Sequence, residues 1–393
     1  MEEWKEFKLG DVVNILDYKR VPLSSKERSL RQGIYPYYGA QGVIDYVDDY
    51  IFDGTYLLIA EDGENLKSKK QNIAQLATGK YWVNNHAHIV ESNGKSDIRF
   101  ICYLLNIMDV SGYITGSAQP KLNQANLLSI SIKLPSLAIQ ESIANYLSIF
   151  DDKIECNRRI NDNLEQQAQA LFKSWFVDFE PFKDGEFVES EMGMIPKGWS
   201  VEVLDNVIEI AKKYINPNRS PEILFTHYSI PAYDNEKQPE KQLGKEILSN
   251  KFIVRDDMTL FSKLNPRIKR IWYVSEILEN SICSTEFVPF MAKESALSVF
   301  VFSLVSSQGF YDFVLSMVNG ATGSHQRFHP EDTLSYKIAY NQAVALKYNA
   351  IAEPMITQTL KNQQESRRLA QLRDTLLPRL MSGELKVNEI EMY

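Results

Sequence analysis

Two stretches of the sequence, residues 147–175 and 352–380, place mostly apolar side chains at steps that alternate between three and four residues. This a/d spacing predicts a long helix that packs along a partner helix. Both stretches keep the same register at an offset of 205 residues, so one chain supplies both partners and an internal duplication is the simplest account. The predicted positions of the helix-pair seam are Leu147, Ile154, Asn157, Leu164, Leu171, Asn362, Leu369 and Leu376.

Segments outside the helices repeat in the same order. Trp4 returns as Trp199, and the tripeptide TGS at 115–117 returns at 322–324. The offset drifts, as it does in divergent repeats with loop insertions. Two unrelated domains that share short sequence motifs by chance would not keep these motifs in the same order. We therefore expect a first domain at 1–136, a long helix at 137–180, a connector with a second domain at 181–341, and a second long helix with a tail at 342–393.

Each half outside its helix has the pattern of a mixed α/β region. Residues 35–38, 54–60 and 271–274 belong to apolar or aromatic runs broken by glycine and aspartate, which is typical of short strands and tight turns. Residues 176–199 hold two prolines and three glycines, so we expect an ordered, loop-like connector there. The predicted fold class is α+β, with two tandem mixed α/β domains related by a pseudo-twofold internal repeat.

Composition sets few limits on function. No run of about 18 apolar residues is present, so we expect no transmembrane helix, and residues 1–10 lack the pattern of a signal peptide. Three widely spaced cysteines favour a reducing cytoplasm over a disulfide framework. The net charge is −8, but residues 176–205 alone hold eight acidic residues against two lysines. The charge therefore neither supports nor excludes a nucleic-acid partner.

Searches for catalytic motifs fail. Residues 93–96 resemble the end of a phosphate-binding loop, but Ile89 occupies the place of the first glycine. No dinucleotide fingerprint and no Asn-Pro-Pro-aromatic run of a DNA amino-methyltransferase is present. The histidine pairs 86/88 and 325/329 lack cysteines or carboxylates at familiar zinc spacings. We predict a binding protein and not an enzyme, with no catalytic residue, no metal site and no cofactor in this chain.

Polar residues in two kinds of loop suggest contact with DNA. Residues 261–273 place four cations around an Asn-Pro turn, which can neutralise phosphates or present guanidinium groups to guanine edges. The TGS segments combine glycine with Ser, Gln and Lys or Arg, which suit phosphate and base-edge acceptors. Solvated turns and packed strand ends remain the alternative interpretation. The candidate DNA-binding residues are Tyr37, Tyr38, Gln41, Glu61, Asp62, His86, Ser117, Gln119, Lys121, Lys263, Asn265, Arg267, Lys269, Arg270, Ser324, Gln326 and Arg327.

Three longer runs resemble a known family. Residues 133–144 (KLPSLAIQESIA) and 172–182 (FKSWFVDFEPF) are similar to the central conserved region of type I restriction–modification specificity subunits. Residues 372–385 (LRDTLLPRLMSGEL) are similar to the distal conserved region. With the tandem halves, the resemblance covers nearly the whole chain.

The resemblance implies two target-recognition domains, each reading one half of a split double-stranded DNA sequence. It implies that the two long helices form an antiparallel coiled-coil pair that separates these domains. It further implies two DNA methyltransferase (modification) subunits bound to the helices, and restriction/translocase subunits. S-adenosylmethionine and ATP would then belong to these partners. Arg373 stands where Ala168 stands in the other ladder, which puts a perfectly symmetric seam in doubt.

Three other interpretations remain. A non-catalytic coiled-coil scaffold would explain the helices but not the paired basic loops. A methyltransferase–nuclease fused to its own reader would need motifs that the sequence lacks. A silent variant of a specificity gene would show the same sequence features. The target bases do not follow from one sequence.

Overall fold

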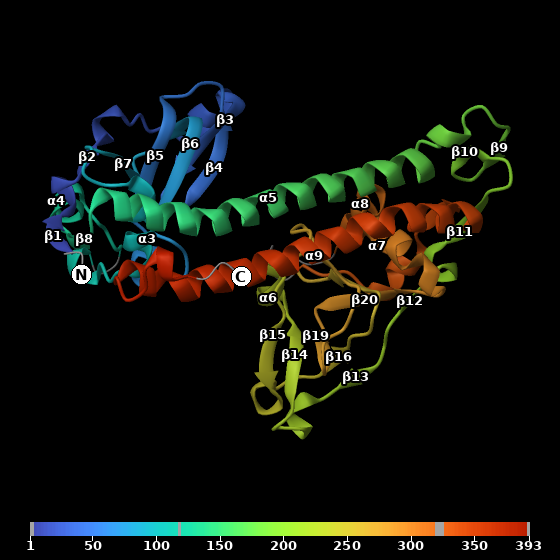
Figure 1. Cartoon of the computed structure of the whole chain (residues 1–393). Coiled ribbons are helices and arrows are strands. Elements are labelled where there is room, and N and C mark those ends of the chain that lie inside the picture. The colour runs from blue at the N-terminus through green and yellow to red at the C-terminus, as the bar shows by residue number, and fades with distance from the viewer. Residues whose placement is uncertain (1–3, 117–118, 319–325, 391–393) are drawn as a thin grey trace. The chain divides into compact units, whose positions relative to one another are not determined.

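The computed structural model describes residues 4–116, 119–318 and 326–390. The chain forms two compact units, unit 1 with Met1–Glu155 and Ser366–Tyr393, and unit 2 with Cys156–Glu365. Two long helices, α5 (Leu137–Phe176) and α9 (Gln342–Met381), each belong partly to unit 1 and partly to unit 2 (Figure 1). The two predicted long helices are confirmed. The finer division into four segments stays a prediction.

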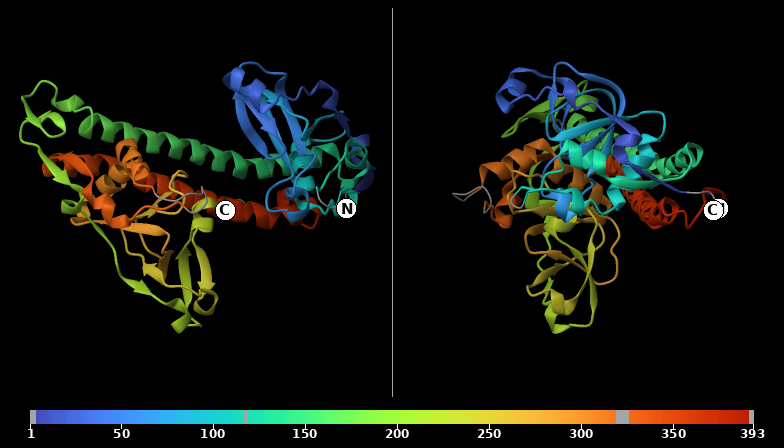
Figure 2. Two further views of the ribbon diagram at one scale, coloured as in Figure 1. Left: turned by 180° about the vertical axis from the view of Figure 1, so that it is seen from behind. Right: turned by 90° about the vertical axis from the view of Figure 1, so that its left-hand side faces the viewer.

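Unit 1 combines a sheet with short helices and one end of each long helix. Its other elements are β1 (Lys5–Lys8), β2 (Val13–Ile15), α1 (Ser25–Leu30), β3 (Gln32–Gly39), β4 (Gly42–Val47), β5 (Phe52–Ala60), α2 (Asn65–Ser68), β6 (Ala74–Val83), β7 (Ala87–Ser92), α3 (Ile98–Ile107), α4 (Gln124–Ser129) and β8 (Ser131–Leu134). Six strands form one sheet in the order β2-β7-β5-β6-β3-β4, and β1 pairs with β8. The blue arrows in Figure 2 belong to strands of unit 1.

The core of unit 1 lies between this sheet and the helices. The apolar run of β5 contributes to this core, and its residues Leu57 and Ile59 are fully buried. Phe100 of α3 and Leu147 of α5 belong to the same buried cluster, as does Leu380 of α9. The amphipathic spacing that the sequence showed is therefore satisfied within unit 1 by its own sheet and helices.

Unit 2 repeats this plan with a larger insertion. Its other elements are β9 (Phe187–Ser190), β10 (Gly193–Pro196), β11 (Ser200–Val203), β12 (Ile208–Ile210), β13 (Tyr214–Ile215), β14 (Leu224–Tyr228), α6 (Ile230–Asp234), β15 (Glu240–Leu243), β16 (Lys251–Ile253), β17 (Met258–Ser262), β18 (Ile271–Val274), β19 (Ser281–Ser284), β20 (Phe287–Ala292), α7 (Ser298–Ser306), α8 (Gln308–Ser316) and β21 (Lys337–Tyr340). Its core includes Phe172, Phe176, Phe300 and Tyr348.

The same four-stranded antiparallel arrangement occurs in both units. Unit 1 contains the strand order β2-β7-β5-β6, and unit 2 contains β12-β20-β17-β18. The pair β1·β8 leads into α5, and the pair β11·β21 leads into α9. Unit 2 adds a five-stranded sheet, β13-β16-β19-β14-β15, where unit 1 has only the hairpin β3–β4. This shared topology confirms the tandem fold class with its internal repeat.

The connector differs from the expectation. Residues 176–199 were predicted to be loop-like, but they contain the antiparallel hairpin β9–β10. A tight turn closes the hairpin, with Gly193 at φ +92 and the hydroxyl of Ser190 donating to the Gly193 carbonyl at 2.6 Å. The prolines and glycines that predicted a loop therefore include turn residues of a hairpin. Helix α5 also ends at Phe176, before the predicted boundary at residue 180.

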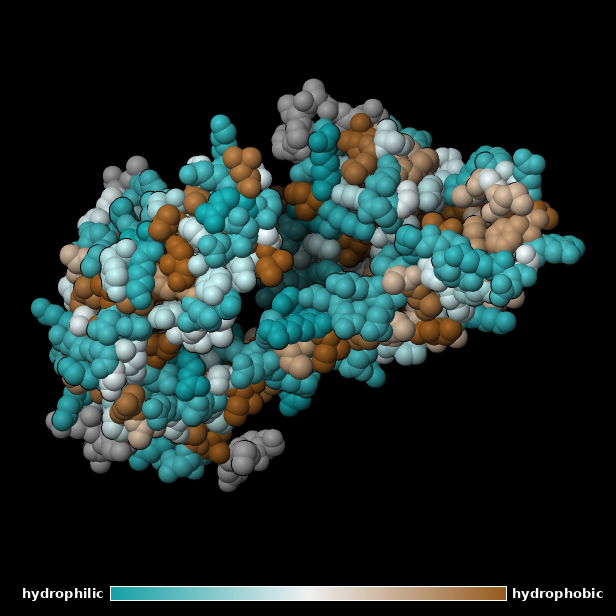
Figure 3. All heavy atoms as spheres, turned by 90° about the horizontal axis from the view of Figure 1, so that it is seen from above, coloured by the Kyte–Doolittle hydropathy of each residue, from teal (hydrophilic) through white to brown (hydrophobic). Residues whose placement is uncertain are grey.

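The surface and the helices both contain apolar side chains. On the face shown in Figure 3, hydrophobic residues occur in scattered groups among hydrophilic ones. Among the described helices, no single one is long and apolar enough to cross a membrane, although one pair bent by 59° passes that test jointly. The first member of this pair contains α7, whose Val299, Val301 and Leu304 lie in the unit 2 core.

Candidate nucleic-acid interface

Three chain segments meet beyond the end of β5 in unit 1. The Glu61 N–H donates to the His86 carbonyl at 2.9 Å, which joins the loop after β5 to the residue before β7. The Gly63 N–H donates to the Pro120 carbonyl at 3.1 Å, which brings in the segment after the first TGS. Gly63 has φ +119, a conformation that favours glycine. Residues separated by up to 60 positions in sequence are thus fixed side by side.

The equivalent segments of unit 2 make the same backbone contacts. The Lys263 N–H donates to the Glu286 carbonyl at 2.8 Å, and the Asn265 N–H donates to the Gln326 carbonyl at 3.0 Å. Asn265 has φ +45, and asparagine tolerates this left-handed region better than most residues do. We call these segments the loop frame, comprising residues 61–63, 86 and 120–121 in unit 1 and residues 263–265, 286 and 326–327 in unit 2.

Charged side chains fill the loop frame of unit 1. Glu61 accepts hydrogen bonds from Arg20 at 2.7 Å and pairs with Lys121 at 3.1 Å. Burial raises the pKa of Glu61, but the hydrogen bonds from Arg20 and Lys121 outweigh burial and hold this pKa below its ordinary value. Asp62 pairs with the exposed His86 at 2.7 Å. The carboxylates therefore orient cations that reach the surface.

Asp17, Glu61 and His88 have the composition of a metal site, since their ligand atoms lie within 4.8 Å of one another. The guanidinium of Arg20 already pairs with both carboxylates, at 3.2 Å to Asp17 and 2.7 Å to Glu61. His88 uses one ring nitrogen on Asp17 at 2.6 Å and the other on the Leu122 carbonyl at 2.7 Å. Arg20 supplies the positive charge here, so this cluster braces the loop frame and does not fit a metal ion.

The five cationic side chains among the candidate DNA-binding residues of unit 2 fall into two groups. Arg327 forms a two-point ion pair with Glu286, at 3.0 and 3.1 Å, which raises the pKa of Arg327. Arg270 forms a similar pair with Asp234 at 2.7 and 2.9 Å, and Lys269 donates to the Ser306 carbonyl at 2.6 Å. Lys263 and Arg267, by contrast, have no ion pair within the described part of the chain. These two side chains remain available to a partner.

Most candidate residues of unit 1 lie in or near the loop frame. Gln41, at the tip of the β3–β4 hairpin, is exposed, and its Nε2 lies 3.8 Å from where a Cβ on Gly63 would stand. Gln119 and Lys121 are also exposed. The predicted contact through Tyr37 is wrong, because Tyr37 is fully buried and its hydroxyl accepts from the Leu23 N–H at 2.8 Å.

The six other candidate residues differ in where they lie. Tyr38 is half-buried against Tyr81, with 5.3 Å between ring centroids, and burial raises the pKa of Tyr38. Ser117 and Ser324 lie outside the described residues. Asn265, Gln326 and Arg327 come together in the loop frame of unit 2.

The seam of the helix pair contains a buried polar cluster in unit 2. Asn362 donates to Asn161 at 2.9 Å, and Asn157 donates to Glu365 at 2.8 Å. Farther along, the Tyr348 hydroxyl donates to the Ala168 carbonyl at 3.0 Å. Residue numbers rise in α5 as they fall in α9, so the two helix segments of unit 2 run antiparallel.

The seam predicted from the ladder is partly buried at Ile154, Leu164, Leu171, Leu369 and Leu376 and fully buried at Leu147. In unit 1, Arg373 pairs with Asp151 on the opposing helix, and the Tyr103 hydroxyl donates to the same carboxylate. Burial and this hydrogen bond raise the pKa of Tyr103. The arginine that departs from the ladder thus has a matched acidic partner.

Sequence reasoning missed Arg20 and Glu286, whereas Asn161 is a position of the ladder at 147–175. Arg20 carried no distinguishing local signal. Glu286 had one, because residues 100–105 (FICYLL) resemble residues 300–305 (FVFSLV) at an offset of 200, and the same offset maps His86 onto Glu286.

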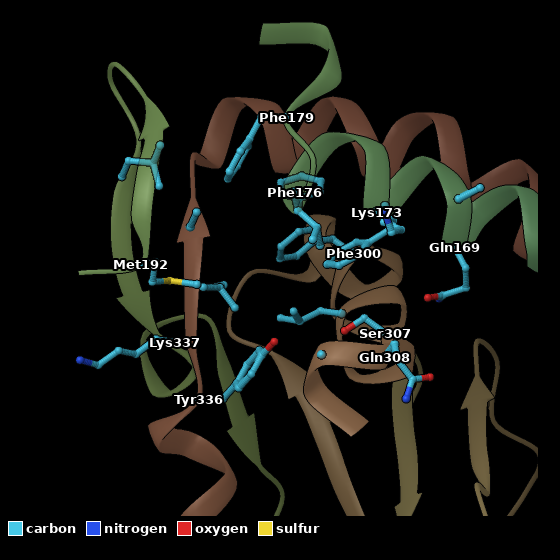
Figure 4. A pocket seen from close by; sticks show the side chains of 18 residues that line it. Gln169, Lys173, Phe176, Phe179, Met192, Phe300, Ser307, Gln308, Tyr336 and Lys337 are labelled. Carbon is cyan, nitrogen blue, oxygen red and sulfur yellow. The ribbon is translucent and has the colours of Figure 1, made fainter. Parts of the chain in front are cut away.

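Unit 2 also contains an apolar cavity of about 520 Å³. Figure 4 shows that its walls come from the end of α5, from α7 and α8, and from strands β10 and β21. Phe176 and Phe300 stand close together on one side, with ring centroids 4.9 Å apart. The lysines at its edge are paired, Lys173 with Asp178 and Lys337 with Glu191. Nothing in this lining forms a catalytic arrangement.

Comparison with known proteins gives a consistent result. The model of the type I restriction modification DNA specificity domain matches residues 1–166. The type I restriction enzyme MjaIX specificity subunit of Methanocaldococcus jannaschii is 30% identical over 307 residues, covering 74% of this chain and 70% of the relative. The type I restriction enzyme HindI specificity subunit of Haemophilus influenzae is 24% identical over 416 residues, covering 85% and 84%. A crystal structure of the type I restriction-modification system S subunit from M. genitalium covers 96% of both chains with a TM-score of 0.61 at 15% identity, which shows the fold.

Proposed function

Because this chain belongs to the type I restriction enzyme specificity subunits, we propose that each of its two units reads one half of a split double-stranded DNA target. The chain is a DNA-recognition subunit and supplies sequence specificity, while catalysis belongs to other subunits of the system.

The loop frames of the two units support the proposal that the chain has two DNA-reading surfaces. Two pairs of matched backbone hydrogen bonds place a polar surface at the same position of the same four-stranded arrangement in each unit. The side chains on that surface differ, because Glu61 and His86 of unit 1 hold the positions that Lys263 and Glu286 hold in unit 2. Two similar backbones that carry different polar groups suit two different half-sites, because base pairs present different patterns of donors and acceptors at their edges.

The proposed partners follow from the family and from the helices. Two DNA methyltransferase subunits would bind along α5 and α9 and would carry S-adenosylmethionine. Restriction/translocase subunits would carry the ATP-dependent activity. Exposed apolar side chains on the helices, including Ile149 at 63% and Leu372 at 43% exposure, support contact with a partner protein. The complex would act in the cytoplasm, where DNA is accessible.

A chimera tests the division of the target. Residues 1–136 are replaced by the equivalent domain of another specificity subunit, and the chimera is produced in a host together with the methyltransferase subunit. Single-molecule methylome sequencing should show a change in one half of the methylated motif and no change in the other. The reciprocal exchange of residues 181–341 is the matched control and should change the opposite half. A change in both halves from either exchange would contradict the proposal.

A further inference from the structure

The loop frame carries a cation at the same backbone position in both units. Lys121 and Arg327 each follow the residue whose carbonyl accepts the matched backbone hydrogen bond. Each cation is paired with a carboxylate, Lys121 with Glu61 at 3.1 Å and Arg327 with Glu286 at 3.0 Å. The two side chains are 51% and 42% exposed, so both reach solvent despite their ion pairs.

The acidic partner comes from a different segment in each unit. Glu61 follows β5, whereas Glu286 precedes β20, which is the position that His86 occupies in unit 1. The shared feature is therefore the oriented, outward-facing cation, and the acid that orients it is supplied from either neighbouring segment. Packing alone would not require the cation to stay in place while its partner changes.

The geometry of Arg327 specifies what it can bind. Glu286 accepts from Nε and Nη2, at 3.0 and 3.1 Å, and so occupies one edge of the planar guanidinium. The other edge, with Nη1 and the second Nη2 hydrogen, has no partner within residues 4–116, 119–318 and 326–390. Two parallel N–H donors match the O6 and N7 acceptors of guanine in the major groove. A carboxylate that already fixes the side chain lowers the entropy lost on binding.

We propose that Arg327 and Lys121 are equivalent base-reading residues, each held by a carboxylate and each selecting a guanine in its own half-site. Glu286 and Glu61 are positioning residues that act through these cations. This inference rests on the proposed function, since it requires that the two loop frames face DNA.

The test begins with the methylated motif of the wild-type complex. Methylation rates are then measured for the full chain assembled with its methyltransferase subunits, on duplexes in which each guanine of the motif is replaced in turn. Arg327→Gln should reduce the preference for one guanine of one half-site by roughly tenfold to a hundredfold and leave the other half-site unchanged. Lys121→Gln should do the same in the opposite half-site.

Glu286 is tested through its effect on Arg327. Glu286→Gln should weaken selection of the same guanine, and Glu286→Asp should restore most of it. Glu191→Gln is the matched control, because Glu191 forms an exposed ion pair with Lys337 elsewhere in unit 2. Thermal unfolding of every variant shows whether the fold is retained. Should Arg327→Gln fail to fold, Arg327→Lys keeps the charge and loses the planar fork, and a reduced preference for guanine is again expected.

Two results would overturn the inference and leave the proposed function standing. One is a uniform loss of rate on all duplexes with a salt dependence lower by about one ion, which would place the cation on a phosphate. The other is a half-site that contains no G·C pair. Failure of the proposed function looks different, because the wild-type complex would then methylate no defined motif at all.

Discussion

The side-chain amide of Asn362 donates a 2.9 Å hydrogen bond to the amide oxygen of Asn161 inside the helix pair of unit 2. Both side chains are at most 8% exposed, and Gln358 donates to the oxygen of Asn362 at 2.7 Å. Buried amides in a helix seam are satisfied in one alignment of the helices and left unpaired in others. This cluster therefore gives α5 and α9 a preferred register within unit 2.

Replacing Asn362 with leucine should destabilise unit 2. The change removes the partner of Asn161 and leaves a buried amide without its hydrogen bond, which costs about 1–3 kcal/mol. Denaturant unfolding of the full chain measures the loss. Gln364→Leu, at an exposed position of α9, is the control and should have little effect. Equal stability of the Asn362 variant and the wild type would show that the cluster has no role in the helix pair.

Gly383 supports the N-terminal part of unit 1. Its φ is +74, and a Cβ at this position would stand 2.7 Å from Nε1 of Trp4. Gly383→Ala should therefore lower the free energy of unfolding by about 1–2 kcal/mol through backbone strain, with a further loss from the displaced indole. Gly112→Ala is the matched control, since nothing lies within 4 Å of its Cβ position. Comparison of the two unfolding midpoints decides the matter.

His227 should make the stability of unit 2 depend on pH. Burial lowers the pKa of His227, and the nearby Lys251 adds to this, while Gln242 and Glu240 oppose it. The folded chain therefore binds a proton less readily than the unfolded chain, whose histidine titrates near pH 6.5. The stabilising contribution is present above that pH and is lost as the pH falls through the lowered value. Unfolding free energies of the wild type should decline over this range.

His227→Gln should remove part of that decline, because the side chain no longer titrates. Denaturant unfolding at several values of pH between neutral and acidic provides the measurement. The same exchange at the exposed His329 is the control. Parallel pH profiles for the wild type and the His227 variant would rule out this contribution.

Arg267 should contribute to recognition of one half-site. Its side chain is exposed, and its backbone carbonyl accepts from the Tyr311 hydroxyl at 3.0 Å, which fixes the loop beneath it. Arg267→Ala should weaken recognition at one base pair by about 1–3 kcal/mol, because a guanidinium on a base edge contributes about that much discrimination. Methylation rates on single-substituted duplexes measure this effect. An equal loss on every duplex would instead assign Arg267 to the phosphate backbone, and Arg219→Ala is the exposed-arginine control in unit 2.

The prediction of the helices succeeded because helix signals are local. Apolar side chains at every third or fourth position indicate which face of a helix is buried, and this spacing runs through 147–175 in α5 and 352–380 in α9. The run 54–60 predicted β5 for a similar reason, since consecutive apolar residues buried on both faces are typical of a central strand.

Two predictions failed, one for Tyr37 and one for the connector. Tyr37 has the sequence context of an exposed strand end, yet Val47 and Trp82 cover it. The connector at 176–199 has the composition of a loop, yet its turn residues close a hairpin. The burial of Tyr37 has no local signature, because segments distant in sequence cover it. The hairpin is local, but its prolines and glycines are as typical of a loop as of a turn.

By itself, the sequence determined the tandem repeat, the two long helices and the absence of familiar catalytic motifs. Helical periodicity and short sequence motifs can be recognised within short stretches of the chain. Only the tertiary structure decided which polar residues share a surface. It joined Glu61 to Lys121 and Glu286 to Arg327 through strand pairings that span tens of residues. Side chains from separate segments become one interface only when backbone hydrogen bonds fix the segments together, and a linear pattern does not record those bonds.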